Sequence, residues 1–222
     1  MKKTMKYPVM LASLLVVAAS AVSSYADVSA KPSTKLLAQT ENLEADVLNK
    51  ALTAFNNAVE AGITDSQILT VIDYSKASSE PRLWVFDLAQ SKLLFEELVA
   101  HGRGSGDNYA KNFSNTPQSY QTSLGVFLTD ETYQGGNGYS LRLDGLEEGI
   151  NHLARERAIV IHGANYVNES FVDKNGRLGR SHGCPAVGLD VNKELINTIK
   201  GGSLVVAYYP NEKWINESKF LN

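Results

Sequence analysis

Residues 158–187 constrain the fold of this chain more than any other stretch. They begin with an apolar run, Ala-Ile-Val-Ile, that ends on His162 and Gly163. They end with Arg-Ser-His-Gly-Cys-Pro-Ala-Val, which contains Cys184, the only cysteine of the 222 residues. The apolar β-branched run predicts a buried strand, and the glycine and proline around the cysteine predict a tight turn. A histidine delivered by a strand and a cysteine presented by a turn are the two parts of a thiol nucleophile with its base.

The residues around Cys184 suit this chemistry. A free thiol has a pKa of about 8.5, and a neighbouring histidine lowers it, so we assign Cys184 as nucleophile and His162 as general base. Gly183 has no Cβ, so its N–H can lie close to a developing oxyanion. We therefore expect the backbone N–H groups of Gly183 and Cys184 to form the oxyanion hole. Pro185 disfavours the helical conformation for Cys184 and fixes the direction in which the thiol points.

The pattern of His-Gly, a spacer and Ser-His-Gly-Cys resembles the YkuD-type L,D-transpeptidases, in particular the branch described as murein L,D-transpeptidase catalytic domain. The resemblance covers roughly residues 81–210. Further matching pieces occur upstream and within the spacer, in the same order: His101 to Gly106, Phe113 to Asn115, Thr122 to Phe127, and Gly179 to Ser181.

The resemblance implies an enzyme that cross-links or trims peptidoglycan stem peptides through a cysteine acyl-enzyme, with no cofactor and no metal. It implies a β-sandwich of mixed sheets with the site at its edge, and acylation by carbapenems in preference to penicillins. It also implies that a backbone carbonyl directly after the base orients the imidazole, and Gly163 holds that position. The chain departs from the family in two places: residues 163–180 form a longer spacer than is usual, and Ala186 replaces a polar residue, often Asn.

Substrate-binding candidates lie around the same motif. His182 could line the acceptor side or brace its loop, and Ser181 is expected to make a turn hydrogen bond. The guanidinium of Arg180 suits a stem-peptide carboxylate, although a solvated surface role fits it equally well. Weaker candidates are Tyr139, Asn165, His101 and His152, of which His152 is expected at the surface.

The first residues predict export. Three lysines within the first six residues precede an apolar run from Val9 to Val22, and Ser24-Tyr25-Ala26 then offers a signal-peptidase site. We expect a signal peptide of residues 1–26, with Ala30 as the alternative cleavage point. The mature protein is then expected in the periplasm without a membrane anchor. The net charge of −3 does not favour a nucleic-acid partner.

The remaining pattern predicts a mainly β fold. Residues 27–40 are interpreted as a linker, 41–78 as an N-terminal pair of helices, and 79–222 as the catalytic domain. The second helix is inferred from a capping-box pattern beginning at Thr64 and runs toward Lys76. Strands are predicted at 83–88, 93–99, 125–128, 140–143, 158–162 and 203–209, and a short helix at 191–200. Two long loops, 102–122 and 164–179, are expected near the site.

Three alternatives remain open at this stage. A carboxypeptidase or amidase would pass the same acyl group to water. A sortase-type enzyme also pairs His and Cys, but it needs an arginine after the cysteine, and residues 185–222 contain none. A non-catalytic or metal-binding wall protein could use His162, His182 and Cys184 as ligands, although no Cys-x-x-Cys pair is present. The oligomeric state is not predicted.

Overall fold

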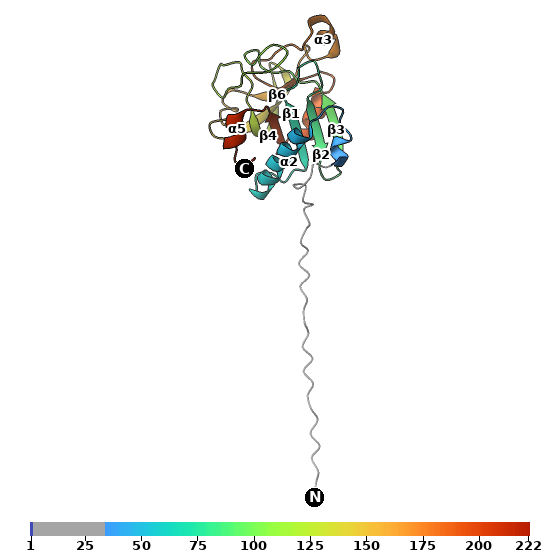
Figure 1. Cartoon of the computed structure of the whole chain (residues 1–222), viewed down its shortest axis with the longest axis vertical. Helices are drawn as coiled ribbons and strands as arrows, with labels where there is room; N and C mark the ends of the chain where they lie inside the picture. The colour runs from blue at the N-terminus through green and yellow to red at the C-terminus, as the bar shows by residue number, and fades with distance from the viewer. Residues whose placement is uncertain (2–33) are drawn as a thin grey trace.

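The structure, a computed structural model, describes Met1 and residues 34–222. The predicted signal peptide and most of the predicted linker lie outside the described residues. The strands are β1 (Ile68–Asp73), β2 (Leu83–Asp87), β3 (Lys92–Glu97), β4 (Gly125–Gly135), β5 (Gly138–Gly145), β6 (Val160–Gly163), β7 (Ala186–Val187) and β8 (Leu204–Tyr208). The helices are α1 (Thr34–Leu37), α2 (Ala45–Glu60), α3 (Glu169–Asn175), α4 (Asn192–Ile199) and α5 (Glu212–Glu217) (Figure 1).

All eight strands belong to one mixed sheet, in the order β3-β2-β1-β8-β4-β5-β6-β7. The β1–β8 and β6–β7 pairs are parallel and the others are antiparallel. Just beyond β3, the Ala100 N–H donates to the carbonyl of Ala186 in β7, at 2.8 Å. The two ends of the sheet therefore meet, and the sheet curls around its own core. The prediction of a mainly β fold with mixed strands is confirmed.

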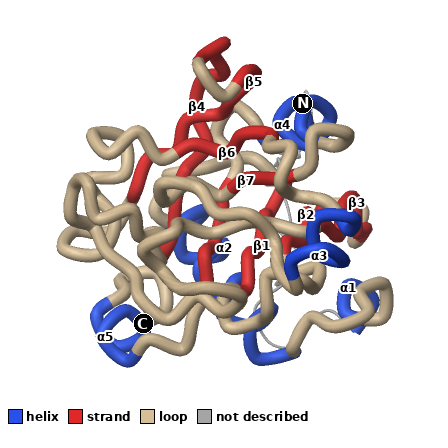
Figure 2. Tube along the Cα trace, turned by 90° about the horizontal axis from the view of Figure 1, so that it is seen from above, coloured by secondary structure: helices blue, strands red, loops and turns tan. Residues whose placement is uncertain are grey.

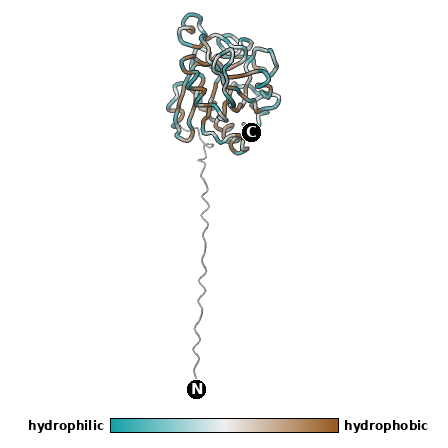
Figure 3. The backbone as a smooth tube through the Cα atoms, turned by 180° about the vertical axis from the view of Figure 1, so that it is seen from behind, coloured by the Kyte–Doolittle hydropathy of each residue, from teal (hydrophilic) through white to brown (hydrophobic). Residues whose placement is uncertain are grey.

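The inner core lies between the two halves of the curled sheet. It joins buried side chains of β1, β2, β4, β5, β6 and β8 with Leu195, Ile196 and Ile199 of α4. Figure 3 shows hydrophobic segments inside the domain and hydrophilic segments along its loops. Burial of each such aliphatic side chain stabilises the fold by about 1.5–3 kcal/mol. The sheet beneath the site therefore has a rigid, closely packed support.

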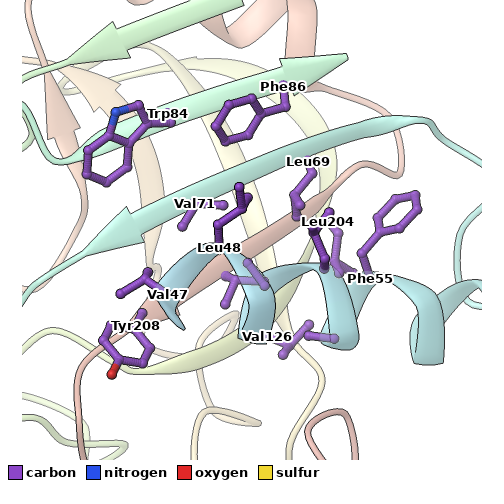
Figure 4. Close-up of a cluster of buried hydrophobic side chains, with 14 of the residues drawn as sticks. Val47, Leu48, Phe55, Leu69, Val71, Trp84, Phe86, Val126, Leu204 and Tyr208 are labelled. Atoms are coloured by element: carbon purple, nitrogen blue, oxygen red, sulfur yellow. The ribbon is translucent and has the colours of Figure 1, made fainter. Parts of the chain in front are cut away.

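Helix α2 covers the outer face of the sheet. Its apolar stripe, spaced by three and four residues as predicted, buries Leu48, Leu52 and Phe55 against β1, β2 and β8. Figure 4 shows Leu48 and Phe55 between the helix and the strands. The helix ends at Glu60, and Gly62 follows with φ +67°. One predicted helix of the N-terminal segment is thus present.

The second predicted helix is wrong, because residues 68–73 form strand β1 in the middle of the sheet. The hydroxyl of Thr64 donates to the carbonyl of Gly202 and accepts from the Ser66 N–H, so it holds a turn and caps no helix. The apolar, partly β-branched sequence Ile-Leu-Thr-Val-Ile is then buried as a strand. The predicted domain division at residue 79 therefore falls inside a single sheet.

The predicted linker is wrong for its last residues, because residues 34–37 form α1 and Leu36 is buried in the outer core. The β2–β3 and β4–β5 hairpins, the histidine strand, α4 and β8 are confirmed. The sequence did not reveal β7, α3 or α5. Figure 2 shows that long loops cross over the strands on one side of the domain. None of the helices in the described part of the chain is long and apolar enough to cross a membrane.

Candidate active site

The β6–β7 pair brings the predicted nucleophile and base to one place. His162 lies in β6 directly opposite Ala186 of β7, and Cys184 comes two residues before Ala186. The His162 side chain is 4% exposed, whereas Cys184 is only partly buried. The eighteen residues between His162 and Ser181 thus form a connecting segment that leaves this edge of the sheet and returns to it.

The imidazole of His162 is held by main chain, as the resemblance implies. Its Nδ1 lies 3.0 Å from the carbonyl oxygen of Gly163. A carbonyl oxygen only accepts, so Nδ1 carries the hydrogen and Nε2 keeps its lone pair. Burial lowers the pKa of His162, and the hydrogen bond to Gly163 partly opposes this. The ring is therefore neutral at neutral pH, the state that a general base requires.

The cysteine turn is held by the hydroxyl of Ser181. This hydroxyl donates to the carbonyl of Cys184 at 2.6 Å and accepts from the Gly183 N–H at 3.0 Å, so the turn hydrogen bond expected of Ser181 is present. The N–H of Gly183, predicted to form part of an oxyanion hole, is therefore already engaged by Ser181, and the N–H of Cys184 is the remaining candidate donor. Gly183 has φ +126°, and a Cβ there would lie 2.8 Å from the carbonyl of Gln121. The position therefore requires glycine.

The thiol of Cys184 donates to the carbonyl of Ala158 at 3.6 Å. Within the described residues it has no hydrogen bond to His162. Burial raises the pKa of Cys184, while backbone N–H groups and the positive charge of Arg157 lower it. The resting cysteine is thus a protonated thiol at neutral pH.

Arg157, which the sequence analysis missed, ties a long loop to this turn. Its guanidinium donates to the carbonyls of Ser114 at 2.5 Å and Gln121 at 2.6 Å, and to the hydroxyls of Ser119 and Ser123. Gln121 is the residue whose carbonyl lies against Gly183. Most of these acceptors are loop carbonyls or serines, so no sequence motif could have revealed the contact.

Two buried residues, Arg82 and His101, support the cysteine turn through a chain of hydrogen bonds. Arg82 donates to the carbonyls of Val99 and Lys76 and to Nδ1 of His101, the last at 2.8 Å. The carbonyl of His101 in turn accepts from the Ser181 N–H at 3.0 Å. Burial and the charge of Arg82 lower the pKa of His101 to about 4. His101 is therefore a neutral structural residue and does not face the thiol as a second base.

The other predicted residues have varied surroundings. Arg180 donates to the carbonyl of Gly106 and pairs with Asp107 at 3.3 Å. The hydroxyl of Tyr139 donates to Asn197 of α4, although Tyr139 adjoins the residue that pairs with His162.

The remaining predicted residues lie at the surface. Asn165 is exposed on the loop after β6. His182 is exposed, with its ring edge-on to Tyr120, 4.9 Å between centroids. His152 lies at the surface beside Glu148, as expected.

In the part of the chain that the structure describes, no three His, Cys, Asp or Glu side chains gather as metal ligands would. The fold and site together define a mainly β protein with a cysteine and a main-chain-oriented histidine at one sheet edge. The chain matches the model of the family described as L,D-transpeptidase catalytic domain over residues 39–208, and it belongs to that family.

Solved structures of L,D-transpeptidases are similar to this chain at low sequence identity. The enzyme from Mycobacterium smegmatis is 13% identical, with 65% of this chain and 59% of that chain covered and a TM-score of 0.41. L,D-transpeptidase 1 from Mycobacterium tuberculosis is 12% identical, with 64% and 62% covered and a TM-score of 0.37. The enzyme from Stackebrandtia nassauensis is 14% identical, with 81% and 89% covered and a TM-score of 0.38.

The chain thus spans less than two thirds of the two mycobacterial proteins. No curated protein matches the sequence.

Replacing Arg157 by Met should raise the pKa of Cys184, because the thiolate loses the positive charge that lowers this pKa. The free energy of unfolding should fall by about 1–3 kcal/mol, because loop carbonyls lose their donor. The pH dependence of iodoacetamide alkylation measures the pKa, and urea unfolding measures the stability. Arg155→Met removes a neighbouring exposed arginine, paired with Asp144 and Asp130, and should leave the pKa unchanged. An unaltered alkylation profile in Arg157→Met would contradict this role.

Proposed function

We propose that this protein is an exported L,D-transpeptidase that acts on peptidoglycan stem peptides through an acyl-enzyme on Cys184, with His162 as base. The observation that carries the proposal is the contact between Nδ1 of His162 and the Gly163 carbonyl, at the sheet edge to which Cys184 returns. That contact leaves Nε2 free to accept a proton. Membership of the family supports peptidoglycan as the substrate class. The apolar N-terminal run supports export to the periplasm.

The reaction follows from these groups. Nε2 of His162 takes the thiol proton while Sγ of Cys184 attacks the carbonyl carbon of the scissile amide. The N–H of Cys184 stabilises the oxyanion, and the intermediate collapses as the leaving amine takes the proton from the imidazolium. An acceptor amine then attacks the thioester, His162 removes its proton, and Sγ leaves as the thiolate. The thiolate recovers its proton from His162, and the resting site is restored.

Both pKa shifts follow from burial. Burial lowers the pKa of His162 and raises that of Cys184, so the neutral pair is favoured over a thiolate–imidazolium pair at rest. The proton therefore has to move when the substrate binds and the thiol leaves the Ala158 carbonyl. The two loops at residues 102–122 and 164–179 are the segments able to exclude water at that moment.

Hydrolysis of the same acyl-enzyme is the second candidate, and the partial exposure of Cys184 favours it, because water reaches the thiol in the resting structure. Transfer requires that an acceptor be held more effectively than water, and positioning supplies effective molarities of about 10⁵ M or more. We favour transfer because two long loops border the site.

Purified protein is supplied with a tetrapeptide-stem donor and with either a D-amino acid or a second stem as acceptor. It should form exchanged or 3-3 cross-linked product, which mass spectrometry detects. Cys184→Ala should form none and should keep its unfolding transition, because one small side chain in a turn contributes little to stability. If only the shortened stem appears at high acceptor concentration, the enzyme is a carboxypeptidase. Turnover by Cys184→Ala would refute both candidates.

Replacing His162 by Ala should lower the acylation rate by about 10²–10⁴-fold at neutral pH, because the thiol loses its base. In the unmodified protein, activity should fall as the pH drops through the pKa of His162, which lies below its ordinary 6.5. Single-turnover acylation across pH 4–9 measures both effects. His152→Ala, at the surface, is the matched control and should behave as the parent protein. A loss of less than tenfold in His162→Ala would identify another base, with His182 tested next.

A further inference from the structure

Three arginines surround the cysteine turn, and two of them already have partners inside the protein. Arg180 pairs with Asp107 and donates to Gly106. Arg157 donates to the loop ending at Ser123. Arg103 differs, because its side chain is exposed and, in the described part of the chain, has no hydrogen bond or ion pair. Its guanidinium lies over the ring of Tyr120, 4.1 Å from the centroid.

The stack of Arg103 and Tyr120 continues to His182, whose ring meets Tyr120 edge-on. Backbone contacts hold these residues against the cysteine turn. The Arg103 N–H donates to the carbonyl of Ser181 at 2.8 Å, and the Gly104 N–H donates to that of Tyr120 at 2.9 Å. These contacts fix the stack beside His182, two residues from the nucleophile.

Gly102 explains how the two segments come so close. A Cβ at Gly102 would lie 2.3 Å from the Tyr120 carbonyl oxygen and 2.8 Å from the Cα of Gly183. Three backbone segments are therefore in contact at this point, and no side chain separates them. The stack cannot move away from the cysteine turn without breaking this contact.

We propose that Arg103, oriented by Tyr120 beside His182, binds the free C-terminal carboxylate of the donor stem peptide. The proposal rests on the proposed function and names the group that the site recognises. A guanidinium placed over an aromatic ring still has N–H groups available for bidentate binding of a carboxylate. His182, which adjoins the stack, is two residues from Cys184, so a carboxylate bound here lies close to the proposed nucleophile and suits a residue next to the scissile amide. The terminal D-residue of a tetrapeptide stem carries such a group.

This assignment moves the carboxylate-binding role from Arg180 to Arg103. Arg180 already donates to the carbonyl of Gly106 and pairs with Asp107, a carboxylate that it shares with Arg177 at 2.7 Å. A substrate carboxylate would have to displace that ion pair. Arg103 requires no such exchange, and its stack on Tyr120 lowers the entropic cost of fixing a long side chain.

The first experiment needs no turnover. Because Cys184 is the only cysteine, alkylation by anionic iodoacetate and by neutral iodoacetamide reports the local charge at the thiol. Arg103→Gln should lower the iodoacetate-to-iodoacetamide rate ratio about threefold at low salt, the effect expected of one charge several ångströms away through water. The matched control is Arg142→Gln, whose guanidinium lies over Tyr133 on the β4–β5 hairpin, 4.4 Å from the ring centroid. It should leave the ratio unchanged, and an unchanged ratio in Arg103→Gln would overturn the proposal.

The second experiment compares tetrapeptide stems with a free and with an amidated C-terminus. Arg103→Gln should raise KM for the free acid about tenfold with little change in kcat, because a charge-assisted contact is lost. The amidated stem should react poorly and equally with both proteins, and Arg103→Lys should recover part of the preference. Equal losses for both stems, or a loss confined to kcat, would mean that the stack only braces the loop and would overturn the proposal.

The two experiments separate the possible failures. If the parent protein fails to turn over any stem while the alkylation ratio shifts, the proposed function fails and an anion-attracting group beside Cys184 stands. If the parent turns over stems and neither the ratio nor KM responds to Arg103→Gln, the function stands and the assignment of Arg103 is wrong.

Discussion

The hydrogen bond between Nδ1 of His162 and the carbonyl of Gly163 is the contact on which the site depends. It fixes the ring and the tautomer with main chain alone, so no acidic third residue is needed. It exists because β6 ends at this point, between β5 and β7, and the next carbonyl turns toward the ring. The curled sheet and its inner core hold the strand end rigidly, so the carbonyl of a glycine suffices to orient the His162 ring.

Burial shifts the pKa values of both His162 and Cys184. It keeps His162 neutral and keeps Cys184 protonated, so the site stores no reactive thiolate before substrate arrives. Arg157 offsets part of the cost of the thiolate and at the same time holds the loop that packs under Gly183. The electrostatic environment of Cys184 and the position of the loop beside it thus depend on the same side chain. Arg103, which makes none of these contacts, is the arginine that we propose for substrate binding.

Much of the fold could be predicted, because the sheet is built largely from local patterns. The β2–β3 hairpin, the strand of His162 and helix α4 each have their own periodicity. The sequence of strand β1 predicts a helix because its few apolar residues follow a capping pattern, and only the contact of Thr64 with Gly202 shows that pattern to be a turn. Strand β7 has two residues and carries no periodic signal.

The candidate site, like the fold, has some features that local sequence predicts and others that it does not. His162, Cys184 and the hydroxyl of Ser181 are recognisable from neighbours in sequence. The partners of Arg157 are loop carbonyls and serines more than thirty residues away, and such groups leave no mark in a motif. The pairing of Arg180 with Asp107 likewise depends on how the loop folds. Sequence patterns therefore could not predict the contacts with groups that only the tertiary structure brings together.

Intact-protein mass spectrometry after rapid mixing with a tetrapeptide-stem donor, with no acceptor present, tests the central claim most directly. A single acyl adduct should appear, equal in mass to the donor less its terminal residue. Peptide mapping should place it on Cys184, and it should form far more slowly in His162→Ala. An adduct on another residue, or product released with no adduct at any time, would contradict the account.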